Sequence, residues 1–100
     1  MEFEWDEGKR VENLRKHKVD FGLAVEIFEG PHVEAQDTRF PYEEERFLAI
    51  GAFEGQHYVV AFTWRSGIRR VISAWRVGPS GAKRYQKVLA GGAARHARPR

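Results

Sequence analysis

The spacing of hydrophobic residues changes from helical to alternating at Gly30-Pro31. Before this point it is helical, because one segment has apolar residues at i, i+3, i+4 and i+7, namely Phe21, Ala24, Val25 and Phe28. After it, apolar and polar residues alternate, as they do in strands with one buried face. Helices followed by a run of strands predict an α+β domain, in which the sheet is antiparallel.

Capping residues predict where the helices begin. Asp6 and Asp20 offer side-chain oxygens to the free N–H groups of helices that start at residues 7 and 21. The first helix is expected to end near His17. Its apolar residues are few, chiefly Val11 and Leu14, so it is expected to lie on the surface with a narrow contact stripe.

Turn signals with Gly or Pro separate the strands that follow. The strands are expected at residues 32–37, 46–53, 57–65 and 68–76, a last helix at 82–89, and a short strand at 3–5. The predicted fold is an α+β domain whose antiparallel sheet has about four strands. Two N-terminal helices and one C-terminal helix are expected on one face of this sheet.

The Ser66-Gly67 turn predicts which side chains share a face of the sheet. With a two-residue turn, one face carries bulky groups and should receive the helices: Tyr58, Val60, Phe62 and Trp64 beside Arg69, Val71, Ser73 and Trp75. The other face would then present the basic side chains His57, Arg65, Arg70 and Arg76. A one-residue bulge would exchange these assignments.

Length and composition exclude several classes of protein. A chain of 100 residues is expected to form one domain, at 1–91, with a basic and disordered tail at 92–100. The absence of Cys excludes disulfides and thiol nucleophiles. The four His residues lie in separate segments, so neither a metal nor another cofactor is expected. No apolar run is long enough for a membrane span or a secretion signal, and we expect a cytoplasmic protein.

Charge is distributed unevenly along the sequence. Residues 1–50 carry 7 basic and 13 acidic side chains, a net charge of −6, whereas residues 51–100 carry 10 basic side chains and only Glu54, a net charge of +9. This asymmetry predicts a basic surface that binds a polyanion or an acidic protein. Neutralisation of one half by the other is the alternative.

Several short blocks, in order, resemble the BrnT family of toxins. They are Phe3-Glu4-Trp5-Asp6, Asn13-Leu14-Arg15-Lys16-His17, Asp37-Thr38-Arg39, Glu44-Glu45-Arg46-Phe47 and the run from Arg70 to Arg76, ahead of Tyr85. The resemblance implies a RelE-like ribonuclease toxin of a type II toxin-antitoxin pair, which cuts RNA and so inhibits translation. It also implies a BrnA-like antitoxin as partner, with DNA contacted only indirectly, through the antitoxin.

Three positions differ from what the resemblance implies. The family usually has Arg at the position of Trp75 and an acidic residue near Gly81, and often has His near Phe40. An active ribonuclease and a catalytically degenerate antitoxin-binding or RNA-binding module therefore remain alternatives. A basic protein with an unrelated acidic partner is a third.

The chemistry of RNA cleavage without a metal ion determines which side chains are candidates for catalysis. The reaction needs a base for the 2′-hydroxyl, positive charge around the phosphate, and an acid for the leaving oxygen. The catalytic candidates are Arg70 and Arg76 as a phosphate clamp, with Tyr85 and His57. Further RNA contacts are expected from Arg46, Arg65, Arg69, Lys83 and Arg84. The antitoxin is expected to cover the same basic face.

Overall fold

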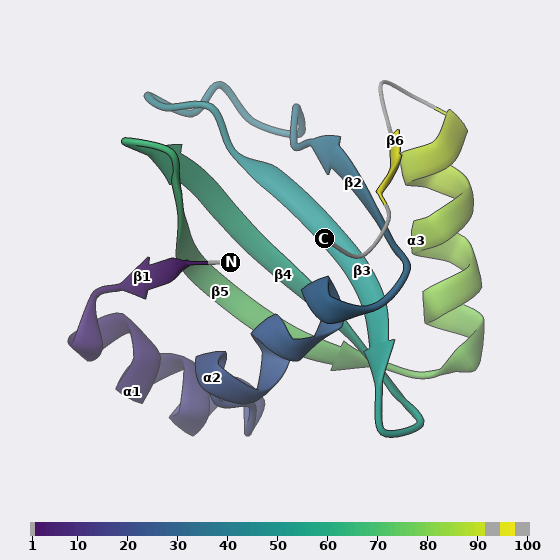
Figure 1. Cartoon of the computed structure of the whole chain (residues 1–100), viewed down its shortest axis with the longest axis horizontal. Coiled ribbons are helices and arrows are strands. Elements are labelled where there is room, and N and C mark those ends of the chain that lie inside the picture. The colour runs from purple at the N-terminus through teal and green to yellow at the C-terminus, as the bar shows by residue number, and fades with distance from the viewer. Residues whose placement is uncertain (1, 92–94, 98–100) are drawn as a thin grey trace.

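The computed structural model describes residues 2–91 and 95–97, with side chains as far as Lys87. In this part of the chain, one six-stranded sheet has the order β1-β5-β4-β3-β2-β6 (Figure 1). The elements are β1 (Phe3–Trp5), α1 (Glu7–His17), α2 (Phe21–Ala24), the 3₁₀ helix η1 (Val25–Glu29), β2 (His32–Gln36), β3 (Phe47–Phe53), β4 (Gln56–Arg65), β5 (Ile68–Val77), α3 (Pro79–Gly91) and β6 (Arg95–Ala97). No helix of the described residues has the length and apolarity to cross a membrane.

The predicted α+β fold and its four central antiparallel strands are confirmed. Two short edge strands enlarge the sheet. β1 pairs in parallel with β5, which makes the sheet mixed, and β6 pairs with β2. The predicted tail at 92–100 lies outside the described residues except for Arg95–Ala97, which forms β6.

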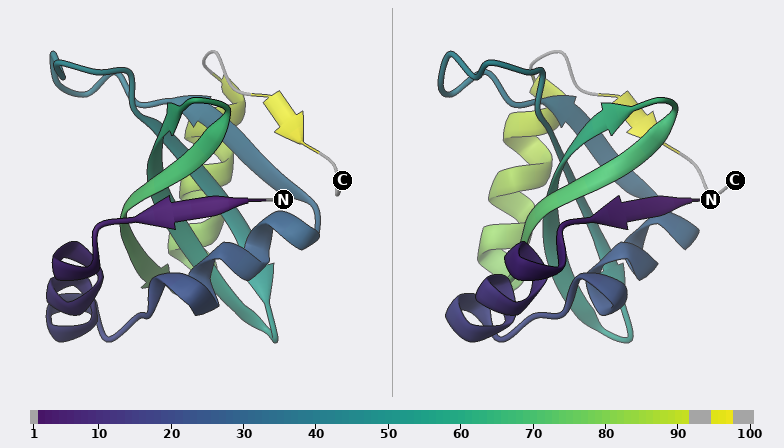
Figure 2. Two further views of the ribbon diagram at one scale, coloured as in Figure 1. Left: turned by 60° about the vertical axis from the view of Figure 1, so that its left-hand side comes forward. Right: turned by 90° about the vertical axis from the view of Figure 1, so that its left-hand side faces the viewer.

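The helices do not share one face of the sheet, so that prediction was wrong. α2 and η1 cover one face, α3 covers the other, and α1 lies against the outer edge of β5 (Figure 2). The reason is that strands β3 and β4 are apolar on both sides, as in a sheet buried between two layers. The open basic sheet face expected from the sequence therefore does not exist, because α3 occupies it.

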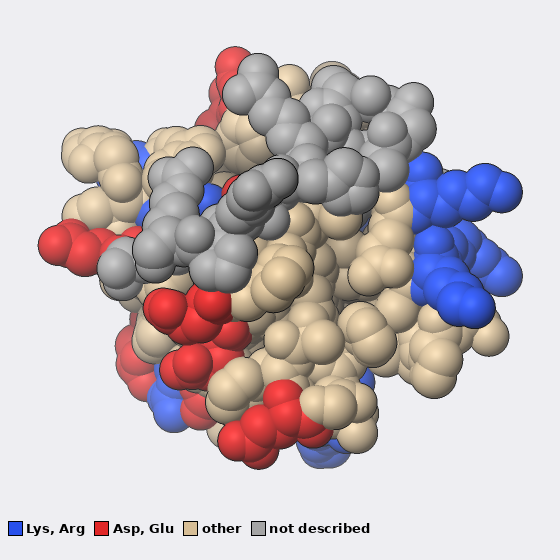
Figure 3. All heavy atoms as spheres, turned by 45° about the vertical axis from the view of Figure 1, so that its right-hand side comes forward, with Lys and Arg blue, Asp and Glu red and all other residues tan. Residues whose placement is uncertain are grey.

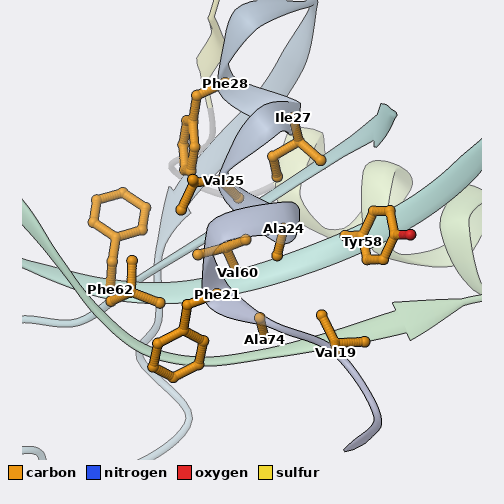
Figure 4. Close-up of a cluster of buried hydrophobic side chains, with 12 residues drawn as sticks. Val19, Phe21, Ala24, Val25, Ile27, Phe28, Tyr58, Val60, Phe62 and Ala74 are labelled. Carbon is orange, nitrogen blue, oxygen red and sulfur yellow. The ribbon is translucent and has the colours of Figure 1, made fainter. Parts of the chain in front are cut away.

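Each face of the sheet has its own hydrophobic core. Beneath α2 and η1, the rings of Phe28 and Phe62 pack edge to face with centroids 5.7 Å apart, and Phe21 and Val25 lie in the same cluster (Figure 4). Trp64, predicted to join them, contacts Phe62 but is 44% exposed. Beneath α3, the smaller cluster contains Leu48, Ile50, Val59 and Ala82, with Trp75 and Tyr85 against it.

A bulge in β5 divides the sheet register into two halves. Near the turn the predicted pairs hold, with Arg65 opposite Ile68 and Thr63 opposite Arg70. Ile72 is then an extra residue, and beyond it Trp75 lies opposite Val59 and Arg76 opposite Tyr58, so that half of the prediction was wrong. Trp75 consequently points to the α3 side and Arg76 to the α2 side.

Helix α1 has the predicted bounds, and the Asp6 side chain accepts the Lys9 N–H at 3.0 Å as an N-cap. Its predicted contact stripe was wrong, because Val11 and Leu14 are 56% and 40% exposed. The inward residue is instead the buried Asn13. Its amide donates to the carbonyls of Val19 and Ala74, both at 2.9 Å, and accepts the Ala74 N–H at 3.0 Å. Beyond the end of β1, the Asn13 side chain therefore satisfies the backbone N–H and C=O of Ala74 in β5, as a neighbouring strand would.

Replacing Asn13 with alanine should lower the free energy of unfolding by about 2–4 kcal/mol, because the N–H and C=O of Ala74 lose their partners in a buried place. Denaturant unfolding measures this change. Val11→Ala, on the exposed side of the same helix, is the control and should change stability by less than about 1 kcal/mol. Equal effects of the two substitutions would contradict the role given to Asn13.

Candidate functional site

The bulge separates the two arginines expected to clamp one phosphate. Arg70 and Arg76 lie six positions apart on β5, about 20 Å along a strand, and point to opposite faces. Arg70 donates a hydrogen bond to the carboxylate of Glu4 across the β1–β5 pair. Arg76 is exposed, with its guanidinium carbon 5.9 Å from the Tyr58 ring centroid. A joint clamp by these two side chains is therefore excluded.

Arg69 lies inside the protein rather than on the expected RNA surface. Its side chain is 3% exposed and donates to both carboxylate oxygens of Glu34, at 2.9 and 3.1 Å. The guanidinium also lies over the rings of Phe28 and Trp64, with its carbon 4.5 Å from each centroid. The ion pair and the aromatic contacts together indicate that Arg69 has a structural role in the core under η1.

Arg46 and Arg65 lie at another end of the sheet, by the loop between β2 and β3. Arg65 has a guanidinium nitrogen 3.9 Å from a carboxylate oxygen of Glu44, and Arg46 lies over the Tyr42 ring with its guanidinium carbon 4.3 Å from the centroid. The loop itself, residues 36–46, lines an open pocket of about 520 Å³. Arg46 and Arg65, both predicted to bind RNA, thus interact with side chains of this loop.

The same loop is held by the buried carboxylate of Asp37. Arg39 donates two hydrogen bonds to it, both at 2.8 Å, and the Tyr42 hydroxyl donates a third at 3.0 Å. The hydrogen bonds from Arg39 above all, opposed by burial, hold the pKa of Asp37 below its usual value. The charged form of Asp37 is therefore stabilised in the folded state.

A lowered pKa in the folded state gives a definite pH dependence. Asp37 contributes stability above its ordinary pKa of about 4, and this contribution is lost as the pH falls through the folded value. Asp37→Asn should therefore be less stable at neutral pH, and the difference from the parent should shrink toward about pH 2. Denaturant unfolding at both pH values measures it. A difference that grows on acidification would reverse the sign and contradict the argument.

On the α3 side of the sheet, three rings from distant parts of the sequence meet. The Trp75 ring centroid lies 6.4 Å from that of Tyr85 and 6.2 Å from that of His17 at the end of α1. Trp75 and Tyr85 are half-buried, and His17 is exposed. We call His17, Trp75 and Tyr85 the aromatic row. His57, half-buried, points to the same face of the sheet from the start of β4.

Positive charge accompanies Tyr85 on α3. Lys83, Arg84 and Lys87 are exposed on this helix, and the basic side chains gather over it in Figure 3. The row thus combines flat rings and an imidazole, and α3, which carries Tyr85, also carries cations; these are the groups that bind bases and phosphates of a single strand. Within the described residues, no group of three or more His, Asp or Glu is placed to hold a metal ion.

Comparison with known families identifies what kind of protein carries this arrangement. The sequence model of a family described as ribonuclease toxin, BrnT, of type II toxin-antitoxin system matches residues 5–79. The chain belongs to the BrnT toxin family. The match extends from the end of β1 to the start of α3, so it includes His17 and Trp75 of this BrnT chain and ends before Tyr85. No curated protein matches the chain.

Membership of the BrnT family confirms the resemblance seen in the sequence and makes the chain a ribonuclease toxin of a type II toxin-antitoxin pair. The structure separates site residues that the sequence placed together, namely Arg70 and Arg76. Of the predicted residues, Tyr85, Lys83 and Arg84 lie on α3. The structure adds His17 to the candidates, the last residue of a block that the sequence had already singled out.

Proposed function

We propose that this BrnT chain cuts single-stranded RNA without a metal at the aromatic row, inhibits translation in this way, and is neutralised by a BrnA-like antitoxin. It acts in the cytoplasm and reaches DNA only through the antitoxin. The observation that carries the proposal is the contact of His17 and Tyr85 with Trp75, together with the cations on the helix that carries Tyr85. A proton-transfer group and stacking rings are then in contact, and phosphate-binding charges lie on the helix that carries Tyr85.

The residues of the row fit the steps of RNA cleavage. The 2′-oxygen attacks the adjacent phosphorus and the bond to the 5′-oxygen breaks, which yields a 2′,3′-cyclic phosphate and a 5′-hydroxyl. The imidazole of His17 accepts the 2′-hydroxyl proton, and the Tyr85 hydroxyl supplies a proton to the leaving oxygen. Trp75 stacks a base, and Lys83 and Arg84 bind the flanking phosphates.

Cleavage of a labelled single-stranded RNA in a buffer with chelator tests this function, assayed with and without ribosomes. The purified chain should release a product with a 2′,3′-cyclic phosphate. His17→Ala should lower the rate by about 100-fold with little change in RNA affinity, because it removes a group used in proton transfer. His57→Ala is the matched control. A large loss with His57→Ala and none with His17→Ala would move the site away from the row.

A second candidate function is a non-catalytic module that binds the antitoxin or RNA. It is favoured by Trp75, which stands where the resemblance implies Arg, and by the ion pair that Arg70 makes with Glu4. Trp75→Arg distinguishes the two. A parent that does not cut and a variant that does would show a degenerate toxin, whereas a cutting parent that loses RNA affinity in the variant supports the stacking role.

A further inference from the structure

Helix α1 exposes its apolar residues and buries polar ones. Val11 and Leu14 lie three positions apart, so they are neighbours on one side of the helix, and they are 56% and 40% exposed. On its opposite side, Asn13 is 5% exposed and is held by three hydrogen bonds to the backbone of Val19 and Ala74. This is the reverse of the usual amphipathic surface helix.

The polar contacts also prevent the helix from turning its apolar side inward. Arg10 donates two hydrogen bonds to Asp20, at 2.9 and 3.2 Å, and a further one to Glu7. Rotation of α1 would break these bonds together with those of Asn13 and would leave buried polar groups unpaired. Val11 and Leu14 are thus held at the surface by the fold itself, and they form an apolar pair that another molecule can cover.

The charge beside the apolar pair indicates the chemistry of that molecule. Residues 11–18 carry the cations Arg15, Lys16 and Lys18 and only one carboxylate, Glu12, a net charge of +2. Glu12 is shared between Arg15 and Lys16, at 3.7 Å from the Lys16 ammonium, whereas Lys18 makes no ion pair within the described residues. A partner that covers Val11 and Leu14 therefore gains from carboxylates next to the end of α1.

We propose that α1 is the docking surface of the antitoxin, which places on it an amphipathic helix with apolar side chains over Val11 and Leu14 and carboxylates facing Arg15 and Lys18. The identity of the partner rests on the proposed function, and the surface rests on the exposure and charge of α1. The same helix ends at His17, whose ring contacts Trp75. The antitoxin is thus bound next to the aromatic row rather than over a sheet face.

Titration of the chain with its purified cognate antitoxin, followed by calorimetry, tests the surface. Val11→Glu with Leu14→Glu should weaken binding by about 100-fold, because it places two charges in an apolar contact. Leu23→Glu is the matched control, an apolar side chain of α2 that is 38% exposed, and it should change binding by less than about threefold. Thermal unfolding confirms that both variants remain folded.

Antitoxin binding, the oligomeric state of the free chain and RNA cleavage test different claims. Unchanged antitoxin binding by the double variant overturns the docking surface, as does a failure of the unmodified chain to bind. If the double substitution instead converts a dimer of the free chain to a monomer while antitoxin binding persists, the surface belongs to a second copy. RNA cleavage is measured separately on the free chain. Its absence overturns the proposed ribonuclease activity without bearing on where the antitoxin binds.

Discussion

Replacing Phe28 with alanine is expected to lower the free energy of unfolding by about 3–5 kcal/mol. Phe28 has no exposed surface, and its ring centroid lies 5.3 Å from that of Phe3 and 5.7 Å from that of Phe62. The guanidinium carbon of Arg69 is 4.5 Å from the same ring. Alanine would leave a cavity under η1 and remove one of the rings over which Arg69 is buried. Urea unfolding followed by fluorescence measures the loss.

Phe40→Ala provides the comparison, because Phe40 is 63% exposed in the loop between β2 and β3. This variant should differ from the parent by less than about 1 kcal/mol. If the two Phe→Ala variants unfold at the same urea concentration, the ring of Phe28 does not have the packing described for it.

Replacing Arg69 with methionine should also lower the free energy of unfolding by about 3–5 kcal/mol, because it leaves the carboxylate of Glu34 largely buried without its cation. The Glu34 side chain is 18% exposed, and its other partner is His32, at 3.2 Å. RNA affinity should change little, since the guanidinium lies in the interior. Denaturant unfolding and an RNA-binding titration of the folded variant measure the two effects separately.

Arg76→Met is the control for this arginine, because Arg76 is exposed on the same strand and should have little effect on stability. Combining Arg69→Met with Glu34→Gln should recover part of the stability, since the unpaired charge is then removed. A normally stable Arg69→Met that binds RNA weakly would show that the arginine reaches the solvent and works there.

The bounds of the N-terminal helices could be predicted from sequence because their signals are local. The carboxylates of Asp6 and Asp20 accept the backbone N–H groups of Lys9 and Gly22, as capping residues do. The second helix differs in one respect, since it tightens to a 3₁₀ helix from Val25. Its apolar residues still reach the core, because spacings of three and four both place side chains on one side.

The position of α3 and the pairing of β1 could not be predicted in this way. An amphipathic pattern shows which side of a helix is buried but not which face of a sheet buries it, and β3 and β4 are apolar on both. β1 has only three residues, too few for a periodicity, and its parallel register with Arg69–Val71 is a pairing with a strand far later in the chain, which no local signal marks.

Only those parts of the candidate site that lie within one element could be predicted from the sequence. Tyr85, Lys83 and Arg84 follow one another on one helix, so the sequence alone places them on the same element, although on different sides of it. The contact of His17 with Trp75 joins α1 to β5 and depends on the face to which Trp75 points. That face depends on the bulge at Ile72, which no Gly or Pro marks in the sequence.

Because of the bulge at Ile72, the alternation of β5 side chains between the two faces of the sheet shifts by one residue at that point. Counting residues in twos from Arg69 or Arg70 therefore gives the wrong face of the sheet for Trp75 and Arg76. Deletion of the extra residue would leave Trp75 opposite Val59 and Arg76 opposite Tyr58, on the faces that they occupy now, whereas a regular strand of the present length would exchange their faces. A relative with one residue fewer between these positions would therefore keep its tryptophan beside Tyr85, on a strand without a bulge. In this strand, residues can thus be compared across a one-residue gap at the bulge without a change of face.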